Sequence, residues 1–170
     1  MVFAMQEQLP RDYEIKKFDL PEMTMREMKQ LLKDQLLCRI TFHDEPYPYV
    51  LPMEYYFSGD TMYFHFTTTG KKMDLLARDP SVTVEVDWHD DLLTDYRSTI
   101  LKGRLVPVEN PAEYNMISVA MSSAVREKAG IKSFLNIPWG KKGIDYLAAS
   151  NIPLKLYKLD VKEMSGKKAH

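Results

Sequence analysis

Apolar residues recur with the period of a helix in the stretch that follows Leu20-Pro21. Thr24 stands three residues before Glu27, which is the spacing of a capping box. Apolar residues then follow at helical spacing, at Met25, Met28, Leu31, Leu32 and Leu36. The pattern predicts a helix over about residues 23–35, preceded by a polar lead-in over residues 1–20.

From residue 37 the apolar positions change to a period of two, which is typical of half-buried strands. This alternation predicts six strands, over residues 38–43, 47–57, 61–66, 82–88, 100–108 and 154–161. A short helix is predicted between Met73 and Asp79, and a longer one from Asn110 to about Lys128. Residues 131–151 are predicted to mix loop and short helix, and residues 162–170 to form a basic tail.

The predicted strand over residues 47–57 contains two prolines. Its apolar residues share one face, at Tyr47, Tyr49, Leu51, Met53, Tyr55 and Phe57. Pro48 and Pro52 cannot donate ladder hydrogen bonds, so we expect at least one side of this strand to be unpaired along part of its length. That gap is available to a ligand or to another chain.

Six strands joined mostly by hairpins, with few helices, favour a small antiparallel barrel over a doubly wound α/β sheet. A barrel also removes the edges that such hydrophobic strands would otherwise expose. No repeat, low-complexity segment or linker divides the chain, so residues 1–170 are expected to form a single domain.

Composition narrows the function classes without identifying one. The 170 residues carry 23 Lys and Arg against 24 Asp and Glu, and a formal net charge of -1 gives no electrostatic footprint for general nucleic-acid binding. No apolar run approaches the roughly 20 residues that span a bilayer, and the apolar patch at the N-terminus has no basic region, so neither a membrane span nor a signal peptide is expected. Cys38 is the single cysteine, so an internal disulfide is impossible and a reducing, cytoplasmic compartment is expected.

The segment from Thr67 to Lys72 has the residues of an anion site. Its hydroxyl-rich turn follows a strand, and Gly70 then precedes two lysines in the first turn of a predicted helix. Peptide N–H groups at a helix start and the helix dipole favour a negative group, and a phosphate monoester fits this chemistry. The alternative is an exposed basic loop that happens to precede a helix, although lysines in a first turn are mildly unfavourable unless an anion compensates them.

Three other side chains are candidates for the same site. His65, two residues before Thr67, can hydrogen-bond a ligand or relay a proton, but a lone histidine is more often a satisfied surface residue. Arg97 can bind a phosphate through its planar guanidinium or neutralise the acidic loop before it. Trp139 can cap a planar ligand or belong to the core, and the two readings weigh evenly. The sequence has no histidine or cysteine cluster with metal-ligand spacing and no nucleophile–base pair, which favours a protein that borrows its chemistry from a bound cofactor.

Several segments, taken in their order and spacing, resemble one family. They are residues 48–56, 62–65, 70–76, 96–98 with Gly103, and 164–167. Over about residues 20–168 the chain resembles the FMN-binding split-barrel superfamily of pyridoxamine 5′-phosphate oxidase-like proteins, and most of all its nitroimidazole-resistance subgroup.

The resemblance implies a mainly β fold with peripheral helices, a six-stranded antiparallel Greek-key split barrel of the FMN-binding type. It also implies a homodimer that binds FMN in two clefts at its interface. In the family the second-strand segment lines the isoalloxazine largely through backbone groups, and here that segment comprises Tyr49, Val50, Leu51, Pro52, Met53 and Glu54. The resemblance places the FMN phosphate on Lys71 and Lys72.

The remaining site residues are implied in the same way. His65, Phe66, Thr67 and Gly70 would lie at the strand end and turn next to the phosphate, and Ser98 with Arg97 would contact the flavin. In nitroimidazole-resistance relatives the corresponding histidine lies beside the flavin, which makes His65 the expected catalytic residue. The stretch 129–150 has no counterpart that the resemblance explains.

The function that the resemblance implies is a dimeric FMN-dependent oxidoreductase. Reduced flavin would pass electrons to a small nitroaromatic or quinone-like acceptor, with a nicotinamide or a partner reductase as donor. A deazaflavin or haem in place of FMN, or a flavin-storage protein without turnover, are the alternatives. Oxidation of vitamin B6 is not expected, because residues 162–170 lack the Arg-x-His type motif of the true oxidases.

Overall fold

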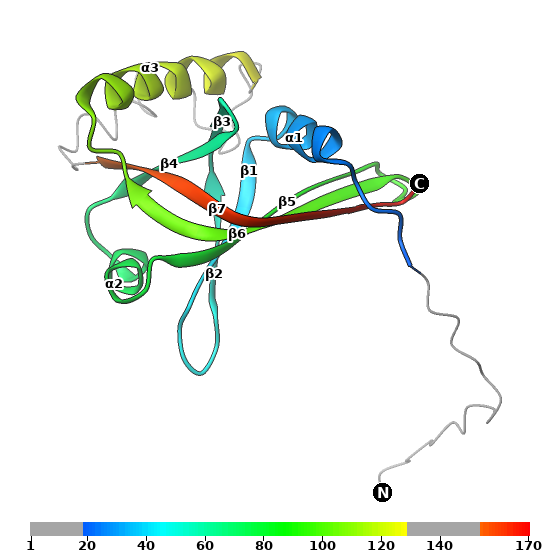
Figure 1. The fold of residues 1–170 in the computed structure, drawn as a ribbon, viewed down its shortest axis with the longest axis horizontal. Helices are drawn as coiled ribbons and strands as arrows, with labels where there is room; N and C mark the ends of the chain where they lie inside the picture. The colour runs from blue at the N-terminus through cyan, green and yellow to red at the C-terminus, as the bar shows by residue number, and fades with distance from the viewer. Residues whose placement is uncertain (1–18, 129–153) are drawn as a thin grey trace, which may run out of the picture.

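A computed structural model of the chain describes residues 19–128 and 154–170 (Figure 1). The described residues form three helices, α1 (Met25–Asp34), α2 (Lys71–Arg78) and α3 (Pro111–Lys128). The strands are β1 (Leu37–Phe42), β2 (Tyr49–Glu54), β3 (Tyr56–Ser58), β4 (Thr61–Thr67), β5 (Ser81–His89), β6 (Tyr96–Pro107) and β7 (Leu154–Lys168). The prediction for residues 131–151 and the candidate Trp139 lie outside the described residues.

Helix α1 begins with the capping box that the sequence predicts. The Thr24 hydroxyl accepts a hydrogen bond from the Glu27 N–H at 3.3 Å, and the Glu27 carboxylate accepts one from the Thr24 N–H at 2.7 Å. Three apolar residues of the helix are buried against the sheet, Met28, Leu31 and Leu32. The predicted helix over 23–35 is therefore confirmed to within two residues at its start and one at its end.

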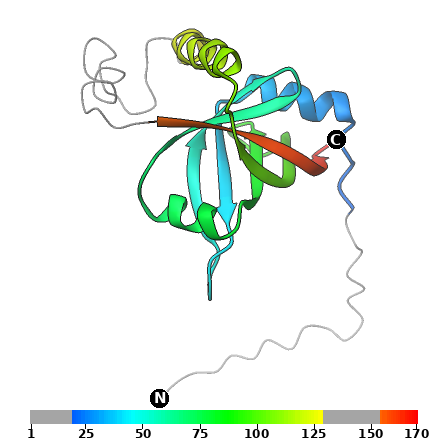
Figure 2. The same cartoon turned by 60° about the vertical axis from the view of Figure 1, so that its left-hand side comes forward.

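The strands form one antiparallel sheet in the order β2-β1-β5-β6-β7-β4-β3. The two outermost strands, β2 and β3, follow each other directly in the chain and are separated only by Tyr55. A sheet whose two edges are joined in this way must curl, and Figures 1 and 2 show the curled sheet with its helices at the periphery. This is the split-barrel architecture that the sequence predicts.

The sheet has seven strands, where the sequence analysis predicted six. The single strand predicted over residues 47–57 is divided at Tyr55, whose N–H bonds to the carbonyl of Leu36 at 3.0 Å. Up to Glu54 the chain pairs with β1, and from Tyr56 onward it pairs with β4. Tyr47, predicted to lie in this strand on the same face as Tyr49 and Leu51, precedes β2 and is 79% exposed.

Strands β6 and β7 are longer than predicted. The segment expected to be a basic tail, residues 162–170, is strand up to Lys168, and β6 begins at Tyr96 instead of residue 100. The register pairs Arg97 with Lys168, so the two extra lengths pair with each other. In Figure 1 they extend with β5 as an arm to one side of the barrel. Because the sequence of this arm is mostly polar, it lacks the alternation of apolar and polar residues by which a half-buried strand is recognised.

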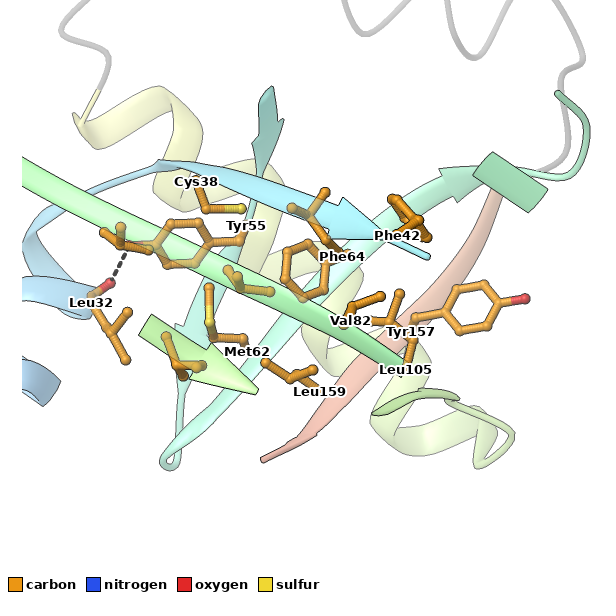
Figure 3. Packing of buried hydrophobic residues seen from close by; sticks show 14 of the residues in the cluster. Leu32, Cys38, Phe42, Tyr55, Met62, Phe64, Val82, Leu105, Tyr157 and Leu159 are labelled. Atoms are coloured by element: carbon orange, nitrogen blue, oxygen red, sulfur yellow. Dashed lines mark hydrogen bonds between the residues drawn. The ribbon is translucent and has the colours of Figure 1, made fainter. Parts of the chain in front are cut away.

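The core lies inside the curled sheet (Figure 3). Phe42, Phe64 and Phe66 are fully buried, and their neighbours include Leu105, Tyr157 and Leu159. The OH group of Tyr55 donates a hydrogen bond to the Leu32 carbonyl, which attaches α1 to this core.

Helices α2 and α3 lie on opposite sides of the curled sheet in both views (Figures 1 and 2). Helix α3 begins as predicted, with Asn110 as its N-cap: the Asn110 Oδ1 atom accepts from the N–H groups of Ala112 at 2.9 Å and Glu113 at 3.1 Å. A second, smaller cluster lies under α3, where Ile117 packs with Tyr63, Val108 and Leu156.

Candidate functional site

The turn between β4 and α2 positions the predicted anion site. Gly70 immediately precedes α2 with φ +103°, a backbone conformation that favours glycine, and it gives the helix no side-chain cap. The peptide N–H groups of the first turn therefore lack the side-chain acceptor that usually satisfies them. The Thr67 hydroxyl tightens the turn by donating to the carbonyl of Thr69 at 3.1 Å.

Lys71 and Lys72 extend from this turn toward different partners. The Lys72 ammonium donates to the Thr67 hydroxyl at 3.0 Å and lies 5.9 Å from the centre of the Phe66 ring. The Lys71 Nζ atom lies 2.7 Å from Oδ2 of Asp44 and 4.8 Å above the Tyr49 ring. Within residues 19–128 and 154–170, no carboxylate is paired with Lys72.

Aromatic rings lie side by side beneath the two lysines. The Phe42 ring is 6.4 Å from Tyr49 and 6.3 Å from Phe66, which joins β2 to β4 through β1. The structure thus gathers six predicted site residues in one place, which we call the phosphate corner. They are Tyr49, Phe66, Thr67, Gly70, Lys71 and Lys72.

Strand β2 leads away from the phosphate corner as an edge strand. It pairs with β1 alone in the sheet order, which agrees with the unpaired side that Pro52 predicts. The side chains of Tyr49, Leu51 and Met53 pack on the core. Those of Val50, Pro52 and Glu54 are exposed on the outer face. Peptide groups on the free side of β2 are consequently available to a ligand or to another chain.

His65 lies on the opposite face of β4 from the core phenylalanines. Its Nε2 atom is 3.3 Å from the Ser118 hydroxyl of α3, and burial lowers the pKa of the imidazole. His65 and Thr67 share one face of the strand because side chains alternate, so two residues of rise, about 7 Å, separate them. The imidazole is therefore neutral at pH 7 and close to the phosphate corner.

A polar network that the sequence analysis did not identify holds α3 over this face. The Glu113 carboxylate accepts from the Tyr63 hydroxyl at 3.1 Å and pairs with Lys158 at 2.9 Å. The Lys158 hydrogen bond is the largest cause that lowers the pKa of Glu113. The network links β4, β7 and α3. Its two contacts to Glu113 join residues 50 and 45 positions apart in the chain, so no local sequence pattern predicts them.

Arg97 and Ser98 lie at the other end of the sheet. Ser98 is opposite Asp87 in the register, five residues along β5 from Val82, which is paired with Phe42 near the phosphate corner. At ~3.3 Å per residue this places Ser98 roughly 16 Å from that end of the sheet. The structure of one chain therefore does not bring these two residues to the lysines.

Each of the two residues lines a hollow of its own. The Arg97 guanidinium lies 5.4 Å from the centre of the Trp88 ring, and both residues line a hollow of about 610 Å³ beside α1. Ser98 lines a second hollow of about 290 Å³ with Ile100, Met164 and Lys167. On the neighbouring strand β7, Lys167 is the residue directly opposite Ser98.

The described residues contain no group of three or more histidine, cysteine, aspartate or glutamate side chains that could hold a metal ion. None of their helices is both long and apolar enough to cross a bilayer.

Comparison with known proteins identifies related families and folds. A family model described as pyridoxamine 5′-phosphate oxidase matches residues 24–168. Among curated proteins the comparison finds no match. Among solved structures, an FAD-binding protein from Mesorhizobium loti aligns with a TM-score of 0.67 at 20% identity, covering 90% of this chain and 100% of that chain.

Two further solved structures have the same fold. A candidate 5-nitroimidazole antibiotic resistance protein from Bacteroides thetaiotaomicron aligns with a TM-score of 0.61 at 19% identity, covering 88% of this chain and 87% of that chain. The FAD-binding protein from Mycobacterium smegmatis aligns with a TM-score of 0.58 at 15% identity, covering 88% and 98% of the two chains.

Proposed function

The chain belongs to the pyridoxamine 5′-phosphate oxidase family, and from this membership we propose that it binds a flavin, FMN, and passes electrons from the reduced flavin to a small nitroaromatic or quinone-like acceptor. The similarity to FAD-binding proteins from M. loti and M. smegmatis supports a flavin. The observation that carries the proposal is the phosphate corner, where Lys72 has a hydroxyl partner and no carboxylate partner among the described residues.

The donors of the phosphate corner fit a phosphate monoester. Lys72 offers an ammonium group, which the Thr67 hydroxyl holds in place, and the start of α2 offers peptide N–H groups at the positive end of the helix dipole. Hydrogen bonds to charged groups contribute about 1.5–3 kcal/mol each. We therefore assign the FMN phosphate to this corner.

The free edge of β2 supports the position of the flavin ring. Residues Tyr49 to Glu54 form an edge strand that begins at the phosphate corner. Its unpaired N–H and C=O groups can bind the polar edge of a planar heterocycle, while Val50 and Pro52 offer exposed apolar surface. Trp139 stays a candidate for covering the ring.

The chain itself supplies binding, orientation and control of protons. A bound flavin would supply the electron-transfer chemistry. His65, neutral at pH 7, can accept a proton at Nδ1 while its Nε2 atom faces Ser118. Lys72 would hold the phosphate of the cofactor, and the β2 edge would hold its ring.

A second copy of the chain completes the proposed site. Ser98 lies roughly 16 Å along β5 from the end near the phosphate corner, at ~3.3 Å per residue, and Arg97 lies one residue farther. We propose that the partner copy contributes these two residues to the flavin, so that a homodimer holds two FMN molecules at its interface.

The first experiment is to purify the protein and identify its bound cofactor. We expect yellow protein with flavin absorbance bands, a dimeric mass, and FMN on chromatography of the denatured supernatant. FAD in that supernatant would mean that the cofactor is FAD and not FMN, and a Soret band would favour haem. A colourless protein that binds no added flavin would refute the proposal. Reduction by a nicotinamide or a partner reductase, followed by repeated reoxidation by a nitroaromatic, would exclude a storage role.

Lys72→Ala tests the corner directly. Loss of a charged hydrogen bond should weaken FMN binding by about 1.5–3 kcal/mol, measured by fluorescence titration. Riboflavin, which lacks the phosphate, is the matched ligand and should bind the variant as well as it binds the wild type. If the variant binds FMN as tightly as the wild type, the assignment of the phosphate to this corner is wrong.

His65→Gln tests the proposed catalytic residue. Glutamine keeps a hydrogen-bonding group beside Ser118 but cannot take up a proton. We expect the flavin content to stay the same and the turnover rate to fall. If neither changes, His65 is a structural residue between β4 and α3.

A further inference from the structure

We propose that Asp44 is a specificity-determining residue of the phosphate corner: its carboxylate engages Lys71 as an internal anion and limits how strongly the corner holds a phosphate group. The inference rests on the proposed function, because it concerns the same site. It adds Asp44, to which the sequence-based prediction of the site gives no role.

Asp44 reaches the phosphate corner from the turn between β1 and β2. Its Oδ2 atom lies 2.7 Å from Lys71 Nζ, and its Oδ1 atom lies 3.8 Å from Arg78 Nη2. The Asp44 side chain is only 16% exposed, whereas that of Lys71 is 56% exposed. The carboxylate is thus held in place beneath a lysine that faces solvent, between the first and last residues of α2.

The two lysines of the corner differ in their charge environment as a result. Lys72 contacts a neutral hydroxyl and an aromatic ring. Lys71 contacts a carboxylate, and its hydrogen bond is the largest cause that lowers the pKa of Asp44. Asp44 is therefore ionised at neutral pH, and it neutralises Lys71.

An incoming phosphate consequently meets one uncompensated ammonium and a nearby carboxylate. Like charges a few ångströms apart repel even in water. The repulsion acts on a phosphorylated flavin and is absent for an unphosphorylated one. Selectivity is the difference between two binding affinities. Because Asp44 lowers the affinity for FMN and not that for riboflavin, it reduces the selectivity of the corner for the phosphorylated ligand.

Asp44→Asn tests the inference, with FMN and riboflavin as the two ligands. Asparagine keeps the size and the acceptor oxygen but removes the charge. We expect FMN affinity to rise about tenfold, riboflavin affinity to stay unchanged, and FMN binding to depend more steeply on salt. Thermal unfolding checks that the variant folds, and Asp44→Ser is the second variant if it does not.

Two controls test whether the charge of Asp44 is the cause. Asp60→Asn removes the same charge from a more exposed carboxylate, which lies 2.6 Å from Lys29 at the far end of β4, and it should leave FMN affinity unchanged. In a Lys71→Ala background Asp44→Asn should still raise FMN affinity, because the carboxylate repels the phosphate whether or not Lys71 is present.

The outcomes separate this inference from the proposed function. If wild-type protein prefers FMN to riboflavin and Lys72→Ala abolishes that preference, the phosphate corner stands. An unchanged FMN affinity in Asp44→Asn, an equal rise for riboflavin, or an equal rise in Asp60→Asn then overturns the role of Asp44 alone. If wild-type protein shows no preference for FMN, the corner and the role of Asp44 fail together.

Discussion

The phenol oxygen of Tyr55 donates a hydrogen bond of 2.9 Å to the main-chain carbonyl of Leu32, and both residues are buried (Figure 3). Leu32 lies in the last turn of α1, where carbonyl groups have no N–H partner within the helix. Tyr55 lies between β2 and β3, the two edges of the sheet. One side chain therefore caps the helix at the place where the curled sheet closes.

Tyr55→Phe should destabilise the protein while keeping its shape. The buried Leu32 carbonyl would lose its partner, and an unsatisfied buried group costs about 1–3 kcal/mol. Chemical denaturation followed by circular dichroism measures the free energy of unfolding. Tyr47→Phe is the matched control, because Tyr47 is 79% exposed, and an equal loss in both variants would argue against the hydrogen bond as the cause.

Gly103→Ala should destabilise the sheet at the irregularity between β6 and β7. A methyl group on Gly103 would overlap the main-chain carbonyl of Asp160, so backbone must move. Overpacking of this kind costs about 1–3 kcal/mol. At Gly166 the added carbon would come within 2.9 Å of the Met28 side chain, which is flexible, so Gly166→Ala should cost less in the same thermal unfolding measurement.

Acid should release α1 from the end of β7. The hydrogen bonds from Lys168 and Thr24 lower the pKa of Glu27 to about 2. Because this pKa lies below that of the unfolded chain, the contribution of Glu27 to stability is complete above the ordinary value of about 4.5 and is lost as the pH falls toward 2.

Glu27→Gln should therefore lower the melting temperature at pH 7 and make little difference near pH 2. Glu163→Gln, which alters the exposed Glu163–Lys102 pair at 2.9 Å, is the control for removing a glutamate charge. A difference between wild type and Glu27→Gln that stays constant over this pH range would contradict the assignment.

His65 should titrate below the ordinary histidine range. Burial under α3 lowers its pKa, so the unfolded chain takes up the proton first as the pH falls below about 6.5. The resulting loss of stability lies between the ordinary value and the lowered one. An NMR titration of the imidazole, assigned with His65→Gln, should give a midpoint below 6.5, and a midpoint above it would mean that His65 is not shielded by α3.

The parts of the fold with a local cause could be predicted from the sequence. Thr24 and Glu27 satisfy each other within one helical turn, and Pro52 cannot donate to a neighbour in any sheet. The residues from Thr67 to Lys72 are also local, because a strand end, a glycine and a helix start follow one another there. The structure accordingly places these residues together, and their role in cofactor binding stays a prediction.

The parts that depend on distant partners could not be predicted. Lys168 is strand because it pairs with Arg97, and alternation is absent from such a polar arm. Tyr55 divides a strand because of a bond to Leu36, and Asp44 reaches Lys71 across a turn and a helix start. Each of these contacts joins residues that are far apart in the chain.

The position of β7 in the sheet has a consequence for synthesis. It lies between β6 and β4, so the four strands on one side and the two on the other are bridged by the strand that is translated last. As long as β7 is inside the ribosome, both β4 and β6 have an unpaired edge. We expect the barrel to close once residues 154–161 have left the exit tunnel, because residues 154–158 pair with β4 and those from Tyr157 onward pair with β6. A nascent chain stalled before that point exposes two unpaired strand edges.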